Sequence, residues 1–389
     1  MDLAVKYQQQ LLDQARQIYR QTPISDATAQ AYLTTPRHLF VRRYRETASK
    51  DWCQVNADNL HEHLATLYAD RALTLFGEDD DQVPSTISQP SFVLRMLDML
   101  QFCPGQTVFE LGAGSGWNAA LIGQLVGPSG HVYSVEIIPE IAQAATETIA
   151  KLGIRNVHIV TGDGGDGYAP AAPYDRVTFT AGTYDLPRHF YDQIKEDGLL
   201  LVVIKNVGGG DNLFVLKKVQ DHFESVGSMP CGFVQLTGKY KIDALDPTSV
   251  DRLPEWVELQ QHETARKPFW WAGKGREWFM WQTSGIRSFL AITEPLFRAF
   301  KTADEDYFGL WDQEHVSLVL ARDDELISYG SPAATDQLLR RVHQWVDLGM
   351  PTAASFGLRV YKSDDVPPTG HNQWMIKRNE SQFLWSLNS

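Results

Sequence analysis

The chain has 389 residues, 43% apolar and 21% charged, an ordinary globular composition in a length that usually divides into two domains. Its formal net charge of −13 argues against nucleic acid as a partner, because a surface that follows phosphates needs clustered Lys and Arg. No stretch approaches the roughly 20 apolar residues of a membrane span, and three dispersed cysteines show no zinc spacing, so we expect a metal-free cytoplasmic protein without a membrane partner.

The first 85 or so residues predict helices and irregular segments. An amphipathic helix is expected over Ala4 to Arg20, and this polar N-terminus lacks the apolar run of a signal peptide. A second helix is expected within Asp58 to Tyr68. The acidic run from Gly77 to Gln82 is typical of a solvated loop.

The middle of the chain alternates short apolar strands with helices. We expect strands over Thr107 to Leu111 and His131 to Glu136, each followed by a helix, and the second helix ends at Gly153 as its C-cap. The series continues with strands at residues 157–160, 176–180 and 199–204, and it closes with strands at 213–219 and 233–236. Strands that alternate with helices imply a mostly parallel, doubly wound α/β sheet covered on both faces.

The composition shifts after about Tyr240, because nine of the eleven tryptophans lie between Lys241 and Ser389. The pattern there predicts a hairpin around residues 322–324, a helix that opens at Ser331-Pro332, and a final hairpin around residues 377–381. We therefore predict a first domain over residues 1–240, with 1–85 as its helical part, and a smaller α+β domain over residues 241–389.

A glycine-rich turn stands where the first strand meets its helix. It reads Glu110-Leu-Gly112-Ala-Gly114-Ser-Gly116-Trp117, a G-x-G-x-G spacing in which backbone amides can approach a ligand closely. The dinucleotide fingerprint requires a third glycine where this chain has Trp117, which disfavours a pyrophosphate cofactor. An adenosyl cofactor with an amino-acid tail fits better, because such a tail needs amide and carboxylate partners.

Acidic residues follow at the ends of the next two strands. Glu136 ends the second strand, where a carboxylate can bind both ribose hydroxyls. Asp163, in Gly162-Asp163-Gly164, ends the third strand and can accept the adenine amino group. Taken alone, each feature is explained as well by a tight turn, a loop acid or a helix cap. On consecutive strand ends and in this order, the three together favour the adenosyl cofactor.

At Thr86-Ile87-Ser88-Gln89-Pro90 the sequence resembles the protein-L-isoaspartate O-methyltransferases. Other segments keep that family's order and spacing: Pro36 to Val41, Asp70 to Leu73, Gly162 to Gly164 with Gly167-Tyr168, Tyr174-Asp175, Thr180-Ala181 with Pro187, and Phe233 to Thr237. The resemblance spans about residues 30–240. It implies a Rossmann-like class I methyltransferase domain, S-adenosyl-L-methionine as cofactor, and a peptide or protein partner that presents an aspartyl or isoaspartyl carboxylate.

Carried over by position, the resemblance also implies the site residues. Ser88 is the implied catalytic hydroxyl between methyl donor and acceptor; without the surrounding motifs, a turn residue or helix N-cap before Pro90 would be preferred. The implied cofactor contacts are Glu110, Gly112, Gly114, Gly116, Glu136, Asp163, Gly164 and Thr237. The implied substrate contacts are Thr86, Ser88, Ala181 and Gly182.

A carboxylate acceptor suits a site without a general base. Its reference pKa of about 4 makes it an oxygen nucleophile at neutral pH, and no His–Asp or Cys–His pair stands out in this half of the chain. The protein then needs only to hold the carboxylate in line with the sulfonium methyl and exclude water. The methyl ester is a better leaving group, so a neighbouring backbone nitrogen can close a succinimide.

The chain departs from the family where the acceptor is expected to bind. The acidic run lengthens the approach to Thr86, Gly182-Thr183-Tyr184 replaces small residues after Thr180, and Ile204-Lys205-Asn206 replaces a Pro-Val-Gly. About 150 further residues follow the point where ordinary repair enzymes end. This extension, which includes Trp270-Trp271, resembles that of a longer subset associated with ribosomally made, modified peptides.

Three functional hypotheses follow. The leading one is a carboxyl O-methyltransferase that esterifies an ordinary aspartate in a ribosomally made, constrained peptide, leading to aspartimide. The alternative is repair of isoaspartyl residues in damaged proteins. A cofactor-binding protein that has lost catalysis is disfavoured by the intact glycine turn. In the leading hypothesis the aromatic extension recognises the peptide, although we expect most of its tryptophans to be core residues.

Overall fold

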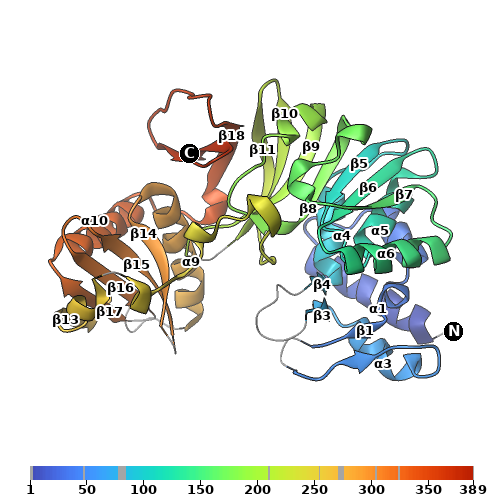
Figure 1. The fold of residues 1–389 in the computed structure, drawn as a ribbon, viewed down its shortest axis with the longest axis horizontal. Coiled ribbons are helices and arrows are strands. Elements are labelled where there is room, and N and C mark those ends of the chain that lie inside the picture. Colours follow the sequence, from blue (N-terminus) through green and yellow to red (C-terminus); the bar gives the residue numbers. More distant parts are fainter. Residues whose placement is uncertain are drawn as a thin grey trace.

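The computed structural model describes residues 3–46, 49–77, 85–208, 211–253, 255–269, 276–302, 305–322 and 325–388. Most of the acidic run 77–82 and the pair Trp270-Trp271 therefore lie outside the described residues. Figure 1 shows a larger lobe built on a ten-stranded sheet and a smaller lobe built on a six-stranded sheet. No helix in the described part of the chain is long and apolar enough to cross a membrane.

The N-terminal region is helical, as predicted, and it also contains two short strand pairs. Its helices are α1 (Leu3–Ile18), α2 (Asp26–Thr34) and α3 (Leu60–Leu67). Its strands pair antiparallel as β1 (Arg43–Tyr44) with β2 (Cys53–Gln54), and β3 (Leu73–Phe76) with β4 (Ser85–Ile87). Because β4 leads into α4 (Pro90–Met99) through residues 88 and 89, this region positions the segment that carries Ser88.

The large sheet contains the predicted Rossmann-like α/β core. Its strand order is β19-β20-β18-β11-β10-β9-β8-β5-β6-β7, and the last five strands are parallel. Those five are β5 (Thr107–Leu111), β6 (His131–Glu136), β7 (Val157–Thr161), β8 (Tyr174–Thr183) and β9 (Ile194–Ile204). The connecting helices are α5 (Trp117–Val126), α6 (Pro139–Lys151) and α7 (Phe190–Gln193). The parallel arrangement places all five carboxyl ends at one edge.

Two antiparallel strands extend this core, β10 (Asn212–Val219) and β11 (His222–Pro230). The first confirms the strand expected at 213–219. The strand expected at 233–236 is wrong, since this segment forms a single bridge between Gln235 and Gly182. The reason lies in β8, which pairs with β5 as far as Phe179, so only its last residues are open to a further partner on that side.

The smaller lobe has the strand order β12-β14-β15-β16-β17-β13. Its strands are β12 (Thr248–Ser249), β13 (Glu263–Pro268), β14 (Phe297–Lys301), β15 (Asp306–Asp312), β16 (Ser317–Arg322) and β17 (Glu325–Gly330). Helices α9 (Arg276–Thr293) and α10 (Ala333–Asp347) pack on one face, and the segment around α8 (Trp256–Leu259) packs on the other. The predicted β16–β17 hairpin and the helix after Pro332 are both confirmed.

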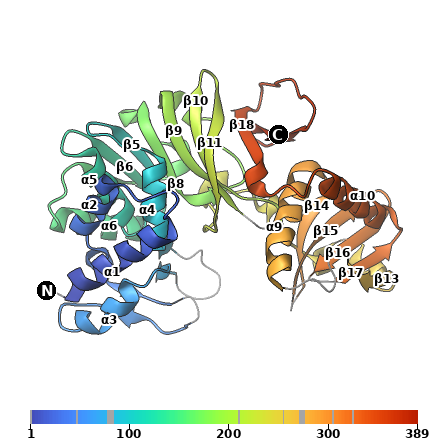
Figure 2. The same cartoon turned by 180° about the vertical axis from the view of Figure 1, so that it is seen from behind.

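The end of the chain returns to the large sheet (Figure 2). Strands β18 (Phe356–Lys362), β19 (Gln373–Lys377) and β20 (Ser381–Leu387) continue it beyond β11, with Phe223 opposite Val360. The predicted final hairpin is present as β19–β20, but it belongs to the first sheet rather than to a separate unit over 241–389. One hydrophobic core therefore includes Phe223 of β11, Trp345 of α10 and Trp385 of β20.

Candidate active site

A cavity of about 540 Å³ lies at the carboxyl ends of β5, β6, β7 and β8, and β4 and the first turns of α4 also line it. Most residues predicted from the sequence line this cavity: Thr86, Ser88, Gly112, Gly114, Glu136, Asp163, Gly164, Ala181 and Thr237. Glu110, Gly116 and Gly182 are not among its lining residues. The fold thus gathers most of the predicted cofactor and acceptor residues into one cavity.

The glycine turn forms the part of the cavity that follows β5. Gly112 and Gly114 have φ angles of +89° and +51°, in the left-handed region that favours glycine. A Cβ at Gly112 would lie 2.4 Å from Thr180 Oγ1, so no larger residue fits there. Gly116, the N-cap of α5, packs instead against Ile149 of α6. The first two glycines therefore shape the cavity, and the third serves helix packing.

Two carboxylates hold the cavity edge in place. Glu136, only 6% exposed, accepts hydrogen bonds from the amides of Gly114 at 2.9 Å and Ile138 at 3.2 Å. Asp163 accepts from the amides of Gly165 at 2.9 Å and Lys239 at 3.0 Å. Each carboxylate lines the cavity while it fixes the loop behind it, which places both where the sequence predicts adenosyl contacts.

Glu110 lies behind the cavity wall rather than on it. Its side chain is fully buried, with Asn118 Nδ2 at 2.6 Å from Oε1 and the Ser134 hydroxyl at 2.5 Å from Oε2. Burial raises the pKa of Glu110 to about 7, although both hydrogen bonds oppose this shift. Its contacts join β5 to β6 and to the first turn of α5, so it supports the glycine turn from behind.

Asn118 is a lining residue that the sequence did not single out. Its amide nitrogen is used by Glu110, whereas its Oδ1 is buried without a hydrogen-bond partner among the described residues. A buried carbonyl oxygen without a donor is costly, and this one lies beside the cavity. It is therefore suited to a donor group on a bound ligand. Its position in the first turn after the glycines is the signal that would have found it.

Arg37 fixes the backbone that carries Ser88. Its guanidinium is fully buried, and Nη2 donates to the carbonyl oxygens of Ile87 at 3.1 Å and Ser88 at 3.0 Å. Burial lowers the pKa of Arg37 to about 10, so it stays charged at neutral pH. A buried cation bound to carbonyl oxygens holds the Ser88 segment in one conformation.

Asp70 fixes the same segment from the other side. Its carboxylate accepts from the amide and hydroxyl of Ser91 at 2.9 and 2.7 Å, and from Gln89 Nε2 at 3.0 Å. The N-cap position of α4 is Gln89 rather than Ser88, so Asp70 satisfies the helix N-terminus in place of a capping serine. Ser88 lines the cavity, and its hydroxyl has no hydrogen-bond partner among the described residues.

The structure places one of the predicted acceptor contacts on the cavity wall and another away from it. Ala181 lines the cavity, but the amide of Gly182 donates to Val234 O and its carbonyl accepts from Leu236 N, both at 2.7 Å. The Gly182 backbone is thus occupied by the chain itself. Phe92 and Phe233, with ring centroids 5.8 Å apart, add an apolar wall that the sequence did not predict.

The residues that line the cavity favour a reaction that depends on positioning of the reactants rather than on a basic side chain. No His, Lys or Arg occurs among the described lining residues, so neither an imidazole base nor a cation faces a bound carboxylate there. Cys231 also lines the cavity, but burial raises its pKa to about 12 and keeps the thiol protonated. Within the described ranges, no group of three or more His, Cys, Asp or Glu is placed to hold a metal.

Sequence comparisons with known proteins agree on one family. The model of the family described as protein-L-isoaspartate(D-aspartate) O-methyltransferase matches residues 6–241. A protein-L-isoaspartate O-methyltransferase of Ignicoccus hospitalis is 36% identical over 44% of this chain and 82% of its own. One of Pyrococcus horikoshii is 33% identical over 56% of this chain and 87% of its own.

A solved structure titled protein-L-isoaspartate O-methyltransferase resembles this one over nearly its whole length. The match has a TM-score of 0.52 and 23% identity, and it covers 96% of this chain and 98% of the other. At that identity the likeness concerns the fold alone. It extends well beyond residue 241, so the likeness in fold is not confined to the part that the family model matches.

Proposed function

Because this chain belongs to the protein-L-isoaspartate O-methyltransferase family, we propose that this S-adenosylmethionine-dependent carboxyl O-methyltransferase acts on isoaspartyl residues of peptides or proteins. The observation that carries the proposal is Ser88, which lines the same cavity as the glycine turn. The names of the relatives favour the isoaspartyl acceptor, our alternative hypothesis, over an ordinary aspartate in a constrained peptide.

The cavity residues fit S-adenosylmethionine. The turn at Gly112 and Gly114 lets a ligand approach the backbone closely, because neither position carries a side chain, and Glu136 and Asp163 offer carboxylates at the next two strand ends. Asn118 adds a buried carbonyl oxygen that lacks a donor. When bound, the cofactor supplies a methyl group on a positively charged sulfur, which is a strong electrophile.

The chain's own residues then have to hold the acceptor. An acceptor carboxylate is ionised at neutral pH, so no proton has to be removed before it attacks. The Ser88 hydroxyl can donate one hydrogen bond that orients this anion, and no cation on the described wall competes for its oxygens. Phe92 and Phe233 keep water from the reacting atoms.

An ordinary aspartate in a constrained peptide remains a second candidate. One observation favours it: residues beyond the family match hold the loop that follows β8, where the acceptor is expected. A loop fixed by additional chain suits one chosen peptide better than many damaged proteins.

Methyl transfer from a labelled donor would separate the candidates. Three acceptors of matched composition are needed: a linear isoaspartyl peptide, the same peptide with ordinary aspartate, and a macrocyclic peptide with ordinary aspartate. We expect turnover of the isoaspartyl peptide alone. Turnover confined to the macrocycle would overturn the proposal in favour of the second candidate.

A further inference from the structure

The turn between β19 and β20 packs against residues 181–188, the last residues of β8 and the loop that follows it, which we call the acceptor loop. Asp185 of this loop is only 4% exposed. Its carboxylate accepts a hydrogen bond from the amide of Glu380 at 2.8 Å and another from the hydroxyl of Ser381. The amide of Leu186 donates both to Asp185 Oδ1, at 2.8 Å, and to the Ser381 hydroxyl, at 3.3 Å. One buried network thus joins two segments that lie far apart in the sequence.

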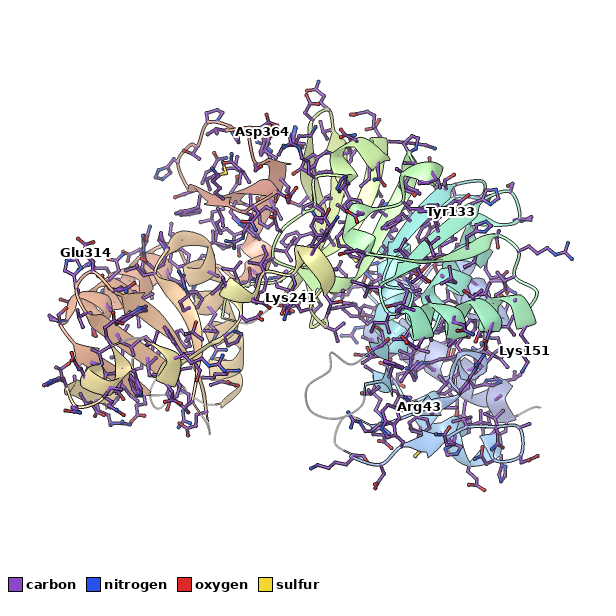
Figure 3. All side chains as sticks on the ribbon, in the orientation of Figure 1. Arg43, Tyr133, Lys151, Lys241, Glu314 and Asp364 are labelled. Atoms are coloured by element: carbon purple, nitrogen blue, oxygen red, sulfur yellow. The ribbon has the colours of Figure 1, made fainter. Side chains whose placement is uncertain are left out.

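Neighbouring contacts join the same two segments. Arg378 Nε donates to the carbonyl oxygen of Tyr184 at 3.1 Å. Arg188 forms an ion pair with Asp364 at 2.9 Å, and Figure 3 shows Asp364 on the C-terminal segment beside the large sheet. That pair is exposed and contributes little, so Asp185 is the main anchor.

This contact does not follow from strand order. In the sheet, β18 and β20 are separated from β8 by β9, β10 and β11. The C-terminal strands attach at the β11 edge, where β18 pairs through Phe223 and Glu224. Their turn nevertheless reaches the acceptor loop and gives Asp185 two of its hydrogen-bond donors. A buried carboxylate needs such donors, because an unpaired one costs several kcal/mol.

The anchor is connected to the cavity through a short run of residues. The Thr183 hydroxyl donates to Asp185 O at 2.6 Å and accepts from Asp185 N at 3.2 Å. Gly182 bonds on both sides of its peptide to Val234 and Leu236, which line the cavity, and Ala181 lines it directly. A shift of Asp185 therefore moves the wall that the acceptor meets, while Gly112 follows β5 and Glu136 ends β6.

The smaller lobe touches the next loop in a similar way. Gly208, in the loop that follows β9, has a φ of +95°, and a Cβ there would lie 2.6 Å from the Phe297 ring of β14. The loops after β8 and β9 thus both contact residues beyond the family match.

We propose that Asp185 is a positioning residue for the acceptor, which fixes the acceptor loop against the β19–β20 turn so that the C-terminal extension shapes the acceptor side of the cavity. Asp185 touches neither reactant; it acts through Gly182 and Ala181. The inference rests on the proposed function, since it concerns the carboxylate acceptor of that same site.

Three variants of the full chain test this role: Asp185→Asn, Ser381→Ala and the double variant. Asp185→Asn removes the charge of the acceptor, and Ser381→Ala removes one of its donors. A hydrogen bond to a charged group contributes about 1.5–3 kcal/mol. We expect KM for the isoaspartyl peptide to rise about tenfold or more in each single variant. The dissociation constant of S-adenosylhomocysteine, measured by calorimetry, should change less than about twofold. The double variant should add little to the singles, because both changes break one network.

Asp98→Asn is the matched control. Asp98 also accepts three hydrogen bonds from another element, from Ser25 N, Ser25 Oγ and Thr28 Oγ1 at 2.9, 2.6 and 2.6 Å, but it joins α4 to α2. The Asp98→Asn variant should leave the KM for the isoaspartyl peptide unchanged. An unchanged KM in Asp185→Asn, or equal losses of peptide and cofactor binding, would overturn the positioning role. Absence of isoaspartyl turnover in the wild-type chain would instead contradict the proposed function.

Discussion

The Ser88 hydroxyl has no partner among the described residues, and Ser88 lines the cavity while Arg37 holds its backbone carbonyl, so the hydroxyl is available to an acceptor carboxylate. Ser88→Ala should lower turnover of an isoaspartyl peptide about 10- to 100-fold, since a hydrogen bond to a charged group contributes roughly 1.5–3 kcal/mol. Calorimetric affinity for S-adenosylhomocysteine should be nearly unchanged. Equal losses of turnover and affinity would instead assign Ser88 to the cofactor site.

Glu110 makes stability depend on pH. Its pKa is about 7 in the folded chain and near 4.5 when unfolded, so between these values only the unfolded state releases the proton. The contribution of Glu110 to the free energy of unfolding is largest below pH 4.5, falls as the pH rises from 4.5 to 7, and is constant above pH 7. Between these pH values the free energy of unfolding of the wild type should fall by about 3 kcal/mol relative to that of Glu110→Gln, at 1.36 kcal/mol per pKa unit. Urea unfolding at pH 5 and pH 8 would show it; a constant difference would contradict it.

Predictability at this scale depends on where a residue sits along its strand. Glu136 and Asp163 could be predicted because parallel strands bring their carboxyl ends together. The resemblance implies Glu110 as a cofactor contact, but a strand buried on both faces has no polar alternation to show which way its carboxylate points. The role of Arg37 could not be predicted from the sequence, because the two carbonyl groups that it holds near the cavity belong to residues 50 and 51 positions further along the chain.

At the scale of elements, α4 depends on an acid outside the helix. Asp70→Ala should lower the free energy of unfolding by about 2 kcal/mol, because it removes the only acid among the described residues that binds the amide and hydroxyl of Ser91. Asp26→Ala is the control, since Asp26 is a solvent-exposed acid in the first turn of α2 and should cost less than about 0.5 kcal/mol. Similar losses in the two variants would show that Asp70 does not cap α4.

The strands of the core were predicted closely, and their partners were not. Apolar runs locate β5 and β6 because each is short and buried. The run at 233–236 looks the same in sequence, yet it pairs with β8 only through Gly182, because β5 occupies that side of β8 as far as Phe179. How far a distant strand extends past its neighbour has no local signal in the segment that would pair with it.

At the scale of the whole molecule, the lack of a local signal for strand partners also explains why the predicted domain boundary at residue 240 does not separate the two sheets. The aromatic composition after Tyr240 marks the extension correctly, and β16, β17 and α10 lie where the pattern places them. The pattern of β18 to β20 does not reveal which sheet they join. The open edge of β11 decides it, because an unpaired strand edge is stabilised by a further strand.

Removing residues 241–389 is therefore expected to damage the large sheet. Without the extension, Phe223 loses the strand opposite it and Phe214 loses the Trp385 ring, whose centroid lies 5.6 Å away. Exposing two such rings costs roughly 3 kcal/mol or more. The temperature at which S-adenosylhomocysteine binding is lost should fall further in the truncated chain than in Asp185→Asn, which keeps every strand. A truncated chain that retained that temperature would show that the sheet ends at β11 in energetic terms, and that residue 240 is the true boundary.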